Sequence, residues 1–418
     1  MAVMNTNPHP PLFGEVGVIA LVPDRWGPSW QARHQIATRL ARYFQVVWVD
    51  RPPTRQEAVR WFRRRSLVWQ PAGTPAGFQV YCPGPLSPNL GRPAWLRRWL
   101  SRERLRQAQR LLQERGCSRI VLYLWRPEFA DSLNLLNHDL SCYHIDDEYS
   151  FSPVERELDA PEVQLIRAVA QVFIHSPAMM RKKGALNPNT QFVPNGVDYQ
   201  KYSTPTPEAA DLRSIPKPRI GYTGNLKRML DWRLLLELSR MHPDWSFVLV
   251  GHMLPQLEVL EVRDELSRRQ NIYVVGPRPS ELIPGYVQHF DVCIMPYKVD
   301  DYTKYIYPLK LHEYLAGGNP VVGSTIPALQ AFEEVVLLAD GSDEWSSMIT
   351  RALSAQENTS ERRTARQQVA ARFDWDLLVE KLARTLVRRL GFAFPDAMDD
   401  HCQHLSQGEL PLAGFAPH

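Results

Sequence analysis

Short apolar runs alternate with helix-like segments along almost the whole chain. The runs are rich in Val and Ile and nearly continuous in apolarity, which is typical of strands buried on both faces. They lie at residues 17–23, 46–52, 120–125, 142–146, 172–176, 192–195, 219–224, 246–251, 272–276, 292–297, 320–324 and 335–340. Because parallel strands need a crossover that is usually a helix, this alternation predicts an α/β protein with doubly wound parallel sheets.

Helical patterns fall between these runs and divide the chain into two series. They cover residues 29–43, 95–115, 161–170, 231–241, 255–269, 280–288, 308–316, 344–355 and 361–390. A Pro-rich, weakly patterned stretch separates the two series and is the best linker candidate. The predicted organisation is a first Rossmann-like domain at 1–203, a linker at 204–218, a second Rossmann-like domain at 219–375, a helix at 376–390 that can return to the first domain, and a tail at 391–418. The two domains are expected to face each other across a cleft.

Composition narrows the functional classes. The chain is 44% hydrophobic and 22% charged, which favours a globular protein over a disordered one. A net charge of +4 is too small to indicate nucleic-acid binding, so no nucleic-acid partner is expected. The five Cys are far apart and form no C-x-x-C pair, which fits a reducing compartment. No signal peptide and no apolar run long enough to span a membrane is found, so we expect a cytoplasmic protein.

Residues 55–115 are strongly basic. They contain 13 Arg and no Lys against three acids, and several Trp lie among them. One interpretation is a set of solvated helix faces. The other is a basic, Trp-bearing surface that rests on an anionic bilayer, which would make the protein peripheral at the inner face of the membrane.

The most specific segment is "YPLKLHEYLAGGNPVVGS", residues 307–324. Lys310 and Glu313 are three residues apart and share one helix face. Two Gly end this helix, and Pro320 prevents its continuation. A polar loop that contains Lys304 and Tyr305 precedes the helix. The simpler alternative is a surface Lys–Glu ion pair.

Two strand-to-helix loops of the second half suggest phosphate or base contacts, because ligands of doubly wound sheets bind at the carboxyl ends of the strands. In the first loop, Gly224 permits close backbone approach, and Asn225, Lys227 and Arg228 follow it, which suits a diphosphate. The alternative is a tight turn with exposed cations.

In the second loop, Gly276 and Arg278 precede Ser280. The loop could recognise a nucleobase through its backbone, or Ser280 could simply cap the next helix. The chain has no G-x-G-x-x-G and no Walker A sequence, so nicotinamide, flavin and ATP signatures are absent.

Three acids, Asp146, Asp147 and Glu148, follow the run at 142–146. They could bind a metal, act as a base or cap the next helix. Asp374 and Asp376 precede a helical pattern and are interpreted as caps rather than as metal ligands. No H-E-x-x-H, G-x-S-x-G or zinc spacing is present, and we expect neither a metal nor a cofactor.

Four segments of the second half carry a resemblance to a known family: "IGYTGNLKRMLDWRLL", "SFVLVG", "IYVVGPRPSELIPGYVQHFDVCIMPY" and "YPLKLHEYLAGGNPVVGS". They resemble the nucleotide-sugar half of family-4-like glycosyltransferases with the GT-B fold. "FVPNGVDYQKY" is similar to the segment that closes the first domain of that family. "VVWVDRPP" and "YHIDDEYSF" resemble the branch that includes teichuronic-acid-biosynthesis glycosyltransferases. The resemblance covers roughly residues 15–390 and is strongest from 190 to 340.

The resemblance implies roles for individual residues. Glu313 matches the helix Glu that accepts hydrogen bonds from both ribose hydroxyls of the donor. A second Glu normally stands eight residues earlier and touches the transferred sugar, but position 305 here is Tyr, so Lys304 or the nearby backbone would have to replace it.

Two further positions depart from the family pattern. An Arg and a Lys of the first loop are replaced by Asn225 and Leu230, which leaves Lys227, Arg228 or Lys310 to neutralise the diphosphate. The family's Gly-Gly loop after the first strand is replaced here by "PDRWGPSW". Gly27 could take the role of that loop, with Ser29 at the start of the following helix.

The function implied by the resemblance is transfer of a sugar from a nucleotide-diphosphate donor to a glycan or lipid-linked acceptor. The first domain would bind the acceptor and the second the nucleotide sugar. The reaction would retain anomeric configuration and need no metal, with Asp146 or Asp147 orienting the acceptor. The departures leave two alternatives open: a catalytically degenerate GT-B binding or partner subunit, and a nucleotide-sugar epimerase.

Overall fold

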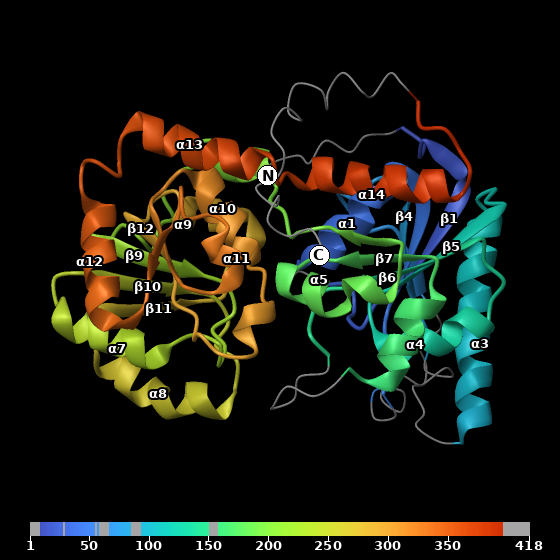
Figure 1. Cartoon of the computed structure of the whole chain (residues 1–418), viewed down its shortest axis with the longest axis horizontal. Helices are drawn as coiled ribbons and strands as arrows, with labels where there is room; N and C mark the ends of the chain where they lie inside the picture. Colours follow the sequence, from blue (N-terminus) through green and yellow to red (C-terminus); the bar gives the residue numbers. More distant parts are fainter. Residues whose placement is uncertain are drawn as a thin grey trace. The chain divides into compact units, whose positions relative to one another are not determined.

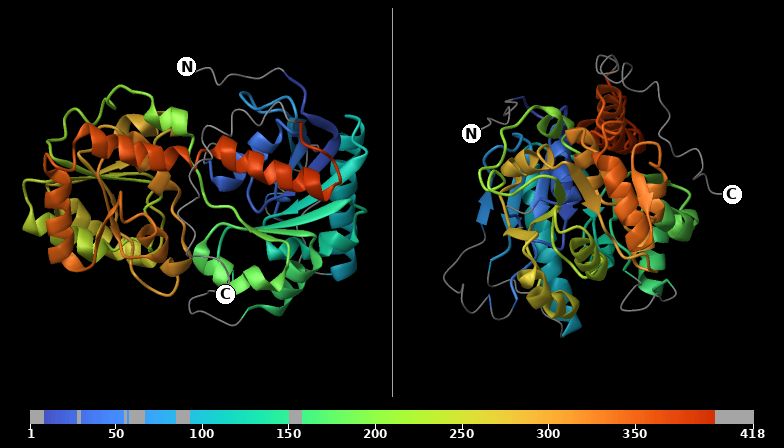
Figure 2. Two further views of the ribbon diagram at one scale, coloured as in Figure 1. Left: turned by 45° about the horizontal axis from the view of Figure 1, so that its top comes forward. Right: turned by 90° about the vertical axis from the view of Figure 1, so that its left-hand side faces the viewer.

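The computed structural model describes residues 9–27, 30–54, 57, 67–84, 93–149 and 158–395 and divides them into two compact units (Figure 1). Unit 1 takes its described residues from Met1–His175, Met179–Val193 and Leu378–Met398. Unit 2 takes them from Ser176–Ala178 and Pro194–Leu377. In each unit, helices lie on both sides of a central sheet (Figure 2).

Unit 1 contains an eight-stranded sheet in the order β3-β4-β2-β1-β5-β6-β7-β8. Its strands are β1 (Phe13–Leu21), β2 (Phe44–Val49), β3 (Leu67–Trp69), β4 (Phe78–Cys82), β5 (Arg119–Leu124), β6 (Leu140–Ile145), β7 (Gln171–Ile174) and β8 (Thr190–Phe192). Every neighbouring pair is parallel except β3 with β4, which is an antiparallel pair at the edge. The longer helices of this unit are α1 (Ala32–Leu40), α3 (Ala94–Gln113), α4 (Ala160–Ala168) and most of α14 (Trp375–Arg389). The short α5 (Pro177–Lys183) crosses the boundary between the units.

Unit 2 contains a six-stranded, fully parallel sheet in the order β11-β10-β9-β12-β13-β14. Its strands are β9 (Arg219–Thr223), β10 (Ser246–Val250), β11 (Ile272–Gly276), β12 (Val292–Met295), β13 (Val321–Ser324) and β14 (Leu337–Ala339). Its α-helices are α6 (Tyr199–Ser203), α7 (Trp232–Met241), α8 (Leu257–Arg268), α9 (Ile283–Val287), α10 (Leu309–Gly317), α11 (Pro327–Gln330), α12 (Gly341–Leu353) and α13 (Ser360–Ala371). Single 3₁₀ turns lie at η3 (Ser280–Leu282) and η4 (Thr303–Tyr305). The parallel α/β architecture predicted from the sequence is therefore confirmed for both units.

The helical pattern at 361–390 forms two helices, α13 and α14, and α14 corresponds closely to the separate helix predicted at 376–390. The break lies around Asp374, whose carboxylate accepts hydrogen bonds from the backbone N–H of Asp376 at 2.7 Å and of Tyr199 at 3.0 Å. A side chain that satisfies the first backbone donors of α14 allows a new helix to begin there. The interpretation of Asp374 as a cap is confirmed, whereas Asp376 does not precede the helix but lies in the first turn of α14.

The boundary between the units differs from the predicted one. The chain leaves unit 1 after Val193, whereas the sequence suggested 203, and the predicted linker 204–218 belongs to unit 2. There the N–H of Ala209 donates to the carbonyl oxygen of Gly285 at 3.3 Å. From Leu378 onward α14 belongs to unit 1, where the Thr385 hydroxyl donates to Gln191 at 2.8 Å.

No helix within the described residues is long and apolar enough to cross a membrane.

Candidate functional site

Three neighbouring strands of unit 2 end at glycines with positive φ. Gly224, Gly251 and Gly276 have φ values of 127°, 154° and 82°, in the left-handed region that side chains disfavour. A Cβ on Gly251 would lie 1.9 Å from the carbonyl oxygen of Gly224. The N–H of Gly251 donates to the carbonyl oxygen of Gly276 at 3.0 Å. The carboxyl edge of this sheet is therefore built from closely packed backbone, which a ligand can approach.

The amine of Lys310 lies against this edge. Lys310 comes from the first turn of α10, and its Nζ is 3.3 Å from where a Cβ of Gly224 would stand. The amine donates a hydrogen bond to the Tyr297 hydroxyl at 3.0 Å and lies 5.0 Å from the ring centroid of Tyr222. Cation–π contact and this hydrogen bond hold the positive charge at the end of β9.

Burial on its own lowers the pKa of Lys310, but its tyrosine neighbours outweigh burial. Tyr222, Tyr297 and Tyr314 together raise the pKa of Lys310 well above its usual range. The side chain is therefore a fixed positive charge at neutral pH.

Glu313 lies one helical turn after Lys310 on α10 and is half-buried. The Tyr202 hydroxyl, from α6, is hydrogen-bonded to its carboxylate. Burial raises the pKa of Glu313, while the charge of Lys310 and the Tyr202 hydrogen bond act in the opposite direction. The sequence left open a surface ion pair between Lys310 and Glu313. Among the described residues Lys310 instead pairs with Tyr297 and makes no ion pair with Glu313. The carboxylate keeps acceptor capacity for another ligand.

The loop after β9 is anchored on both sides. The N–H of Leu226 donates to the carbonyl oxygen of His252 at 2.9 Å, and that of Arg228 to the side chain of Gln256 at 2.7 Å. Asn225 and Arg228 are exposed, and the Lys227 side chain is half-buried. Leu230 is fully buried at 0% exposure, so this position offers nothing to a ligand.

Arg278, expected near a nucleobase, has a structural partner. Its guanidinium forms an ion pair with Asp211 at 2.7 Å and donates to the Tyr286 hydroxyl at 3.0 Å. The hydrogen bond to Asp211 raises the pKa of Arg278 further. The alternative that Ser280 caps a helix is wrong, because its hydroxyl donates to the Glu281 carboxylate and makes no capping bond.

Lys304 and Tyr305 lie on η4, just before α10. Asp300 organises this loop by accepting hydrogen bonds from the N–H groups of Tyr302 and Thr303 at 2.9 and 2.8 Å. The amine of Lys304 pairs with Asp301 at 3.2 Å and lies 5.2 Å from the centroid of the Tyr305 ring. Tyr305 is 6% exposed. The residue that stands in place of the family's first Glu is therefore mostly buried.

In unit 1 the carboxyl end of β6 holds Asp146 and Asp147. Asp146 pairs with Arg33 of α1 at 2.6 Å and accepts from the Tyr149 hydroxyl at 2.5 Å. Asp147 is exposed and accepts from the backbone N–H of Glu148 at 2.9 Å. Asp147 is therefore the more accessible of the two acids.

Glu148 has a different role from its two neighbours. It is 3% exposed and forms an ion pair with Lys183 at 3.0 Å. The three acids do not converge, and the described residues contain no His, Cys, Asp and Glu cluster that could hold a metal. They do not cap the next described helix either, since α4 begins at Ala160.

The backbone at Gly27 does not require a glycine. Its φ is not positive, and a Cβ there would meet only the carbonyl oxygen of Arg25, at 3.9 Å. Ser29 lies outside the described residues.

The sequence reasoning missed Tyr202, Tyr222 and Tyr297, which position Glu313 and Lys310. Tyr222 and Tyr297 lie in predicted buried strands and Tyr202 lies in "FVPNGVDYQKY", so the sequence pattern does not mark any of the three as a contact of a charged side chain.

Comparison with solved structures identifies the class of fold. A sucrose-phosphate synthase from Thermosynechococcus elongatus superposes with a TM-score of 0.65 at 18% identity, over 91% of this chain and 99% of that one. Anabaena Alr3699/HepE, solved in complex with UDP and glucose, gives a TM-score of 0.62 at 17% identity, over 89% and 99% of the two chains. A trehalose-6-phosphate structure from E. coli bound with UDP-2-fluoro glucose gives 0.64 at 11% identity, over 90% and 99%. These similarities show the GT-B fold.

Sequence comparison shows which proteins unit 2 is similar to. The family described as "Glycosyl transferases group 1" matches residues 217–355. TuaH of Bacillus subtilis (strain 168), provisionally named a teichuronic acid biosynthesis glycosyltransferase, is 31% identical over 201 residues. The match covers 46% of this chain and 49% of TuaH, so the chain spans about half the length of this curated relative. Residues 217–355 thus match the family of glycosyl transferases group 1 within a chain that has the GT-B fold, and the resemblance inferred from the sequence is confirmed.

Proposed function

We propose that the protein is a glycosyltransferase that moves a sugar from a nucleotide-diphosphate donor to a glycan or lipid-linked acceptor. The observation that carries the proposal is the pair on α10. A fixed positive charge, Lys310, stands at the glycine edge of unit 2, and one turn later Glu313 offers a half-buried carboxylate. This spacing suits a diphosphate at the end of β9 and a ribose beside the helix.

The chemistry proposed for the site needs no metal. Negative charge develops on the departing nucleoside diphosphate, and a cation held in advance at that position lowers the energy of the transition state. Lys310 fits this task better than Lys227 or Arg228, because two tyrosines fix its amine, whereas Arg228 is exposed on its loop. Retention of anomeric configuration, with the leaving diphosphate accepting the acceptor proton, is part of the proposal.

In unit 1 we propose that Asp147 orients the acceptor. It is exposed at the carboxyl end of β6, the edge at which ligands of such sheets bind. Asp146 would not contact the acceptor but would hold Arg33 and Tyr149 in place, because its carboxylate already interacts with both of them. Sugar contacts in unit 2 would come from Lys304 and the backbone around it.

The second candidate function, a catalytically degenerate binding subunit, rests on Leu230 and Tyr305. Both stand where the family pattern has a charged residue, and both are buried, at 0% and 6% exposure. A donor could then bind through Glu313 without being turned over.

Thermal-shift binding of a panel of UDP-, GDP-, ADP- and dTDP-sugars tests the proposal. We expect one class of donor base to raise the Tm, because bound ligand stabilises the native state by mass action. The donors that bind are then incubated with glycan and lipid-linked acceptors, and release of the nucleoside diphosphate is measured. Release that depends on acceptor supports transfer. Binding without release supports the degenerate subunit, and release without any acceptor points to donor hydrolysis or another activity on free donor.

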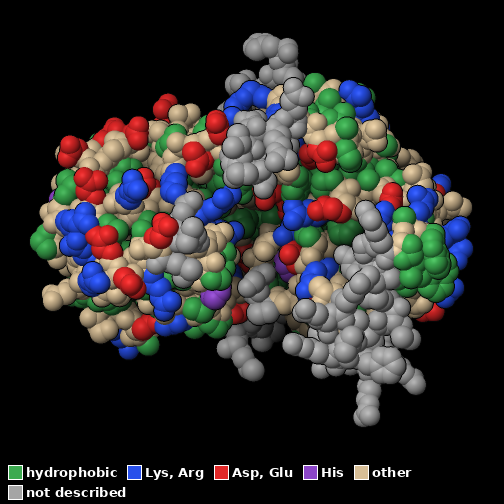
Figure 3. Space-filling model, turned by 90° about the horizontal axis from the view of Figure 1, so that it is seen from below, with side chains coloured by type: hydrophobic (Ala, Val, Ile, Leu, Met, Phe, Trp, Pro, Cys, Tyr) green, Lys and Arg blue, Asp and Glu red, His purple; other side chains and the backbone are tan. Residues whose placement is uncertain are grey.

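The exposed face of α3 supports a membrane-peripheral location. Trp95 and Trp99 are 70% and 57% exposed, and Arg98, Arg102 and Arg106 lie on the same side of the helix. The opposite side packs in unit 1 and is apolar. Figure 3 shows hydrophobic and basic side chains side by side at its right-hand edge, where α3 lies in Figure 1. We propose that this α3 face rests on an anionic bilayer, with Trp at the headgroup level and Arg near the lipid phosphates. The other basic segment, 58–66, lies outside the described residues.

Co-sedimentation with liposomes tests the α3 face. Wild type is expected to bind vesicles that contain anionic lipid, and added salt should weaken the binding. The variant Arg98→Glu/Arg102→Glu should lose most of it, since each basic residue near such a surface contributes about 1 kcal/mol. Arg233→Ala/Arg263→Ala, which removes two exposed cations of unit 2, is the control and should bind as wild type does. Binding that is indifferent to lipid charge and salt would contradict the proposal.

A further inference from the structure

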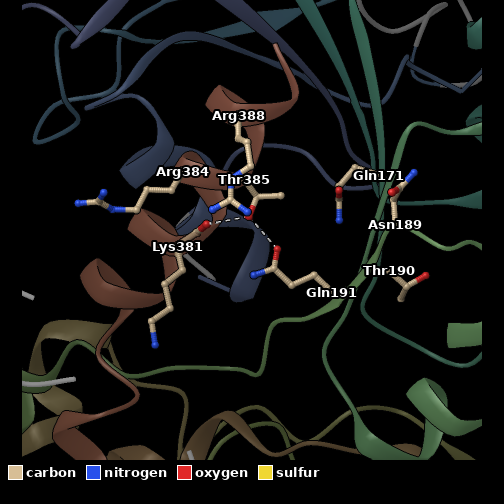
Figure 4. Close-up of a pocket in the computed structure, with 8 residues that line it drawn as sticks. All are labelled: Gln171, Asn189, Thr190, Gln191, Lys381, Arg384, Thr385 and Arg388. Atoms are coloured by element: carbon tan, nitrogen blue, oxygen red, sulfur yellow. Dashed lines mark hydrogen bonds between the residues drawn. The ribbon is translucent and has the colours of Figure 1, made fainter. Parts of the chain in front are cut away.

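A polar groove of about 410 Å³ lies in unit 1, away from the carboxyl edge of its sheet (Figure 4). One wall is α14, from Lys381 to Arg388, and the other is formed where β7 and β8 begin, at Gln171 and Thr190. Ligands of parallel sheets bind at the carboxyl ends of the strands, so the amino ends are the wrong place for the acceptor. The groove is thus separate from the edge that holds Asp147.

The lining of the groove is positively charged. Lys381, Arg384 and Arg388 lie on one face of α14 by their spacing, and the remaining lining residues are neutral and polar, with no acid among them. Arg384 pairs with Glu380 of the same helix at 2.8 Å. Among the described residues, neither the Lys381 amine nor the Arg388 guanidinium has an ion-pair partner. The groove therefore has positive charge that no described residue neutralises.

The helix dipole accounts for only part of this charge. Cations in the last turn of a helix complement its negative end, which explains Arg388 and Arg389. Lys381 lies two turns before the end of α14, beyond the reach of that effect. Its side chain is exposed at the groove, so its charge is accessible to a ligand from solvent.

Neutral hydrogen-bonding groups complete the other wall. The Gln191 side chain accepts from the Thr385 hydroxyl at 2.8 Å, which ties this wall to α14. The Gln171 side chain is 4% exposed, and its amide donates to the carbonyl oxygen of Val172 at 3.2 Å, which leaves a second N–H on the same nitrogen. Asn189 adds a further side-chain amide. Cations with amide donors opposite them suit an oxyanion.

We propose that this groove binds the diphosphate group of a soluble ligand, as an effector site distinct from the donor site of unit 2. Lys381 and Arg388 are seven residues apart, about 10 Å along the helix, which is more than one phosphate group spans. Two linked phosphates can contact both cations, and the fork of Arg388 suits a phosphate bidentately. A ligand here would stabilise the docking of α14 on β8.

Titration with inorganic pyrophosphate, followed by calorimetry and hydrogen–deuterium exchange, tests this site. When pyrophosphate binds, we expect the backbone amides of residues 187–191 and 381–388 to be protected from hydrogen–deuterium exchange. Lys381→Ala/Arg388→Ala should abolish that protection and weaken this binding event by about tenfold or more, because each charge-assisted hydrogen bond contributes about 1.5–3 kcal/mol. Arg233→Ala/Arg263→Ala, which removes the same charge from unit 2, should behave as wild type.

Hydrogen–deuterium exchange also distinguishes binding in this groove from binding at the donor site. Pyrophosphate at the donor site would protect residues 223–228 and the start of α10, and Lys310→Ala should remove that protection while the groove still responds. Protection confined to unit 2, or equal binding by wild type and Lys381→Ala/Arg388→Ala, would overturn the proposal. Binding to vesicles that contain phosphatidic acid, with no response to pyrophosphate, would also overturn it, because the ligand would then be a lipid headgroup.

Discussion

Lys310→Met is expected to lower the rate of sugar transfer at saturating donor by about a hundredfold. The substitution keeps an unbranched apolar chain between Tyr222 and Tyr297 but removes the charge that the two rings hold at the end of β9. Loss of one group that stabilises a developing anion typically costs a factor of about 10²–10³ in kcat. Acceptor-dependent release of nucleoside diphosphate, measured under single-turnover conditions, reports the chemical step directly.

The controls for this prediction are Lys227→Met and Arg228→Met. Both cations lie on the loop after β9, and the sequence alone could not choose between them and Lys310. Arg228 is exposed, so solvent and salt screen its charge, and we expect each of these variants to keep most of the rate. If Arg228→Met shows the large loss and Lys310→Met does not, the diphosphate lies over the loop and not beside α10.

The pH dependence provides a second check on Lys310. Its tyrosine neighbours raise the pKa of its amine, so the group stays protonated through the neutral and mildly alkaline range. Transfer should therefore not fall in that range through loss of this proton. A fall there that Lys310→Met abolishes would mean that the amine titrates, and that burial outweighs the tyrosines.

The strands were predictable from the sequence because most of them are buried on both faces. Val18, Ile19 and Ile294, for example, are fully buried, and each stands in an almost unbroken apolar run. The two strands that the sequence did not reveal break this rule. β4 carries the half-buried Gln79, and β3 is a three-residue antiparallel edge strand with all its side chains exposed.

The site was predictable only where its residues are close in sequence. Lys310 and Glu313 share a helix face by their spacing alone. The contacts of Lys310 with Tyr222 and Tyr297 are tertiary, and an aromatic residue in or beside an apolar strand gives no sign that its hydroxyl or its ring face meets a cation.

The same limit applies in unit 1 and to Arg278. Asp146 is paired with Arg33, 113 residues away in the chain, so its occupied carboxylate could not be foreseen. Arg278 is paired with Asp211, a residue of the predicted linker, in which no residue was expected to have a structural role.

Glu313→Ala is expected to weaken donor binding by about a hundredfold or more, as measured by calorimetry with the donor that the panel selects. A carboxylate can accept from two hydroxyls at once, and each such charged hydrogen bond contributes about 1.5–3 kcal/mol. Glu237→Ala, which removes an exposed Glu of the same unit, is the control and should leave the affinity unchanged.

The affinity should also fall in acid, because the protonated carboxyl accepts hydrogen bonds less well. Burial disfavours the charged form and raises the pKa of Glu313 above its ordinary value of 4.5, against the opposing effects of Lys310 and Tyr202. The loss of donor affinity should therefore begin at a higher pH than an ordinary Glu would give. Glu313→Ala should show no such dependence on pH.

A 2′-deoxy analogue of the donor separates ribose recognition from a merely structural role of Glu313. Wild type should bind the analogue about tenfold more weakly than the donor itself, because one hydroxyl that the carboxylate accepts from is missing. Glu313→Ala should bind the two ligands equally, so the two losses are not additive when they are combined. If the variant still distinguishes the analogue by the same factor, Glu313 does not contact that hydroxyl. Its carboxylate would then serve α10 through Tyr202, and the ribose would have to lie elsewhere on the glycine edge.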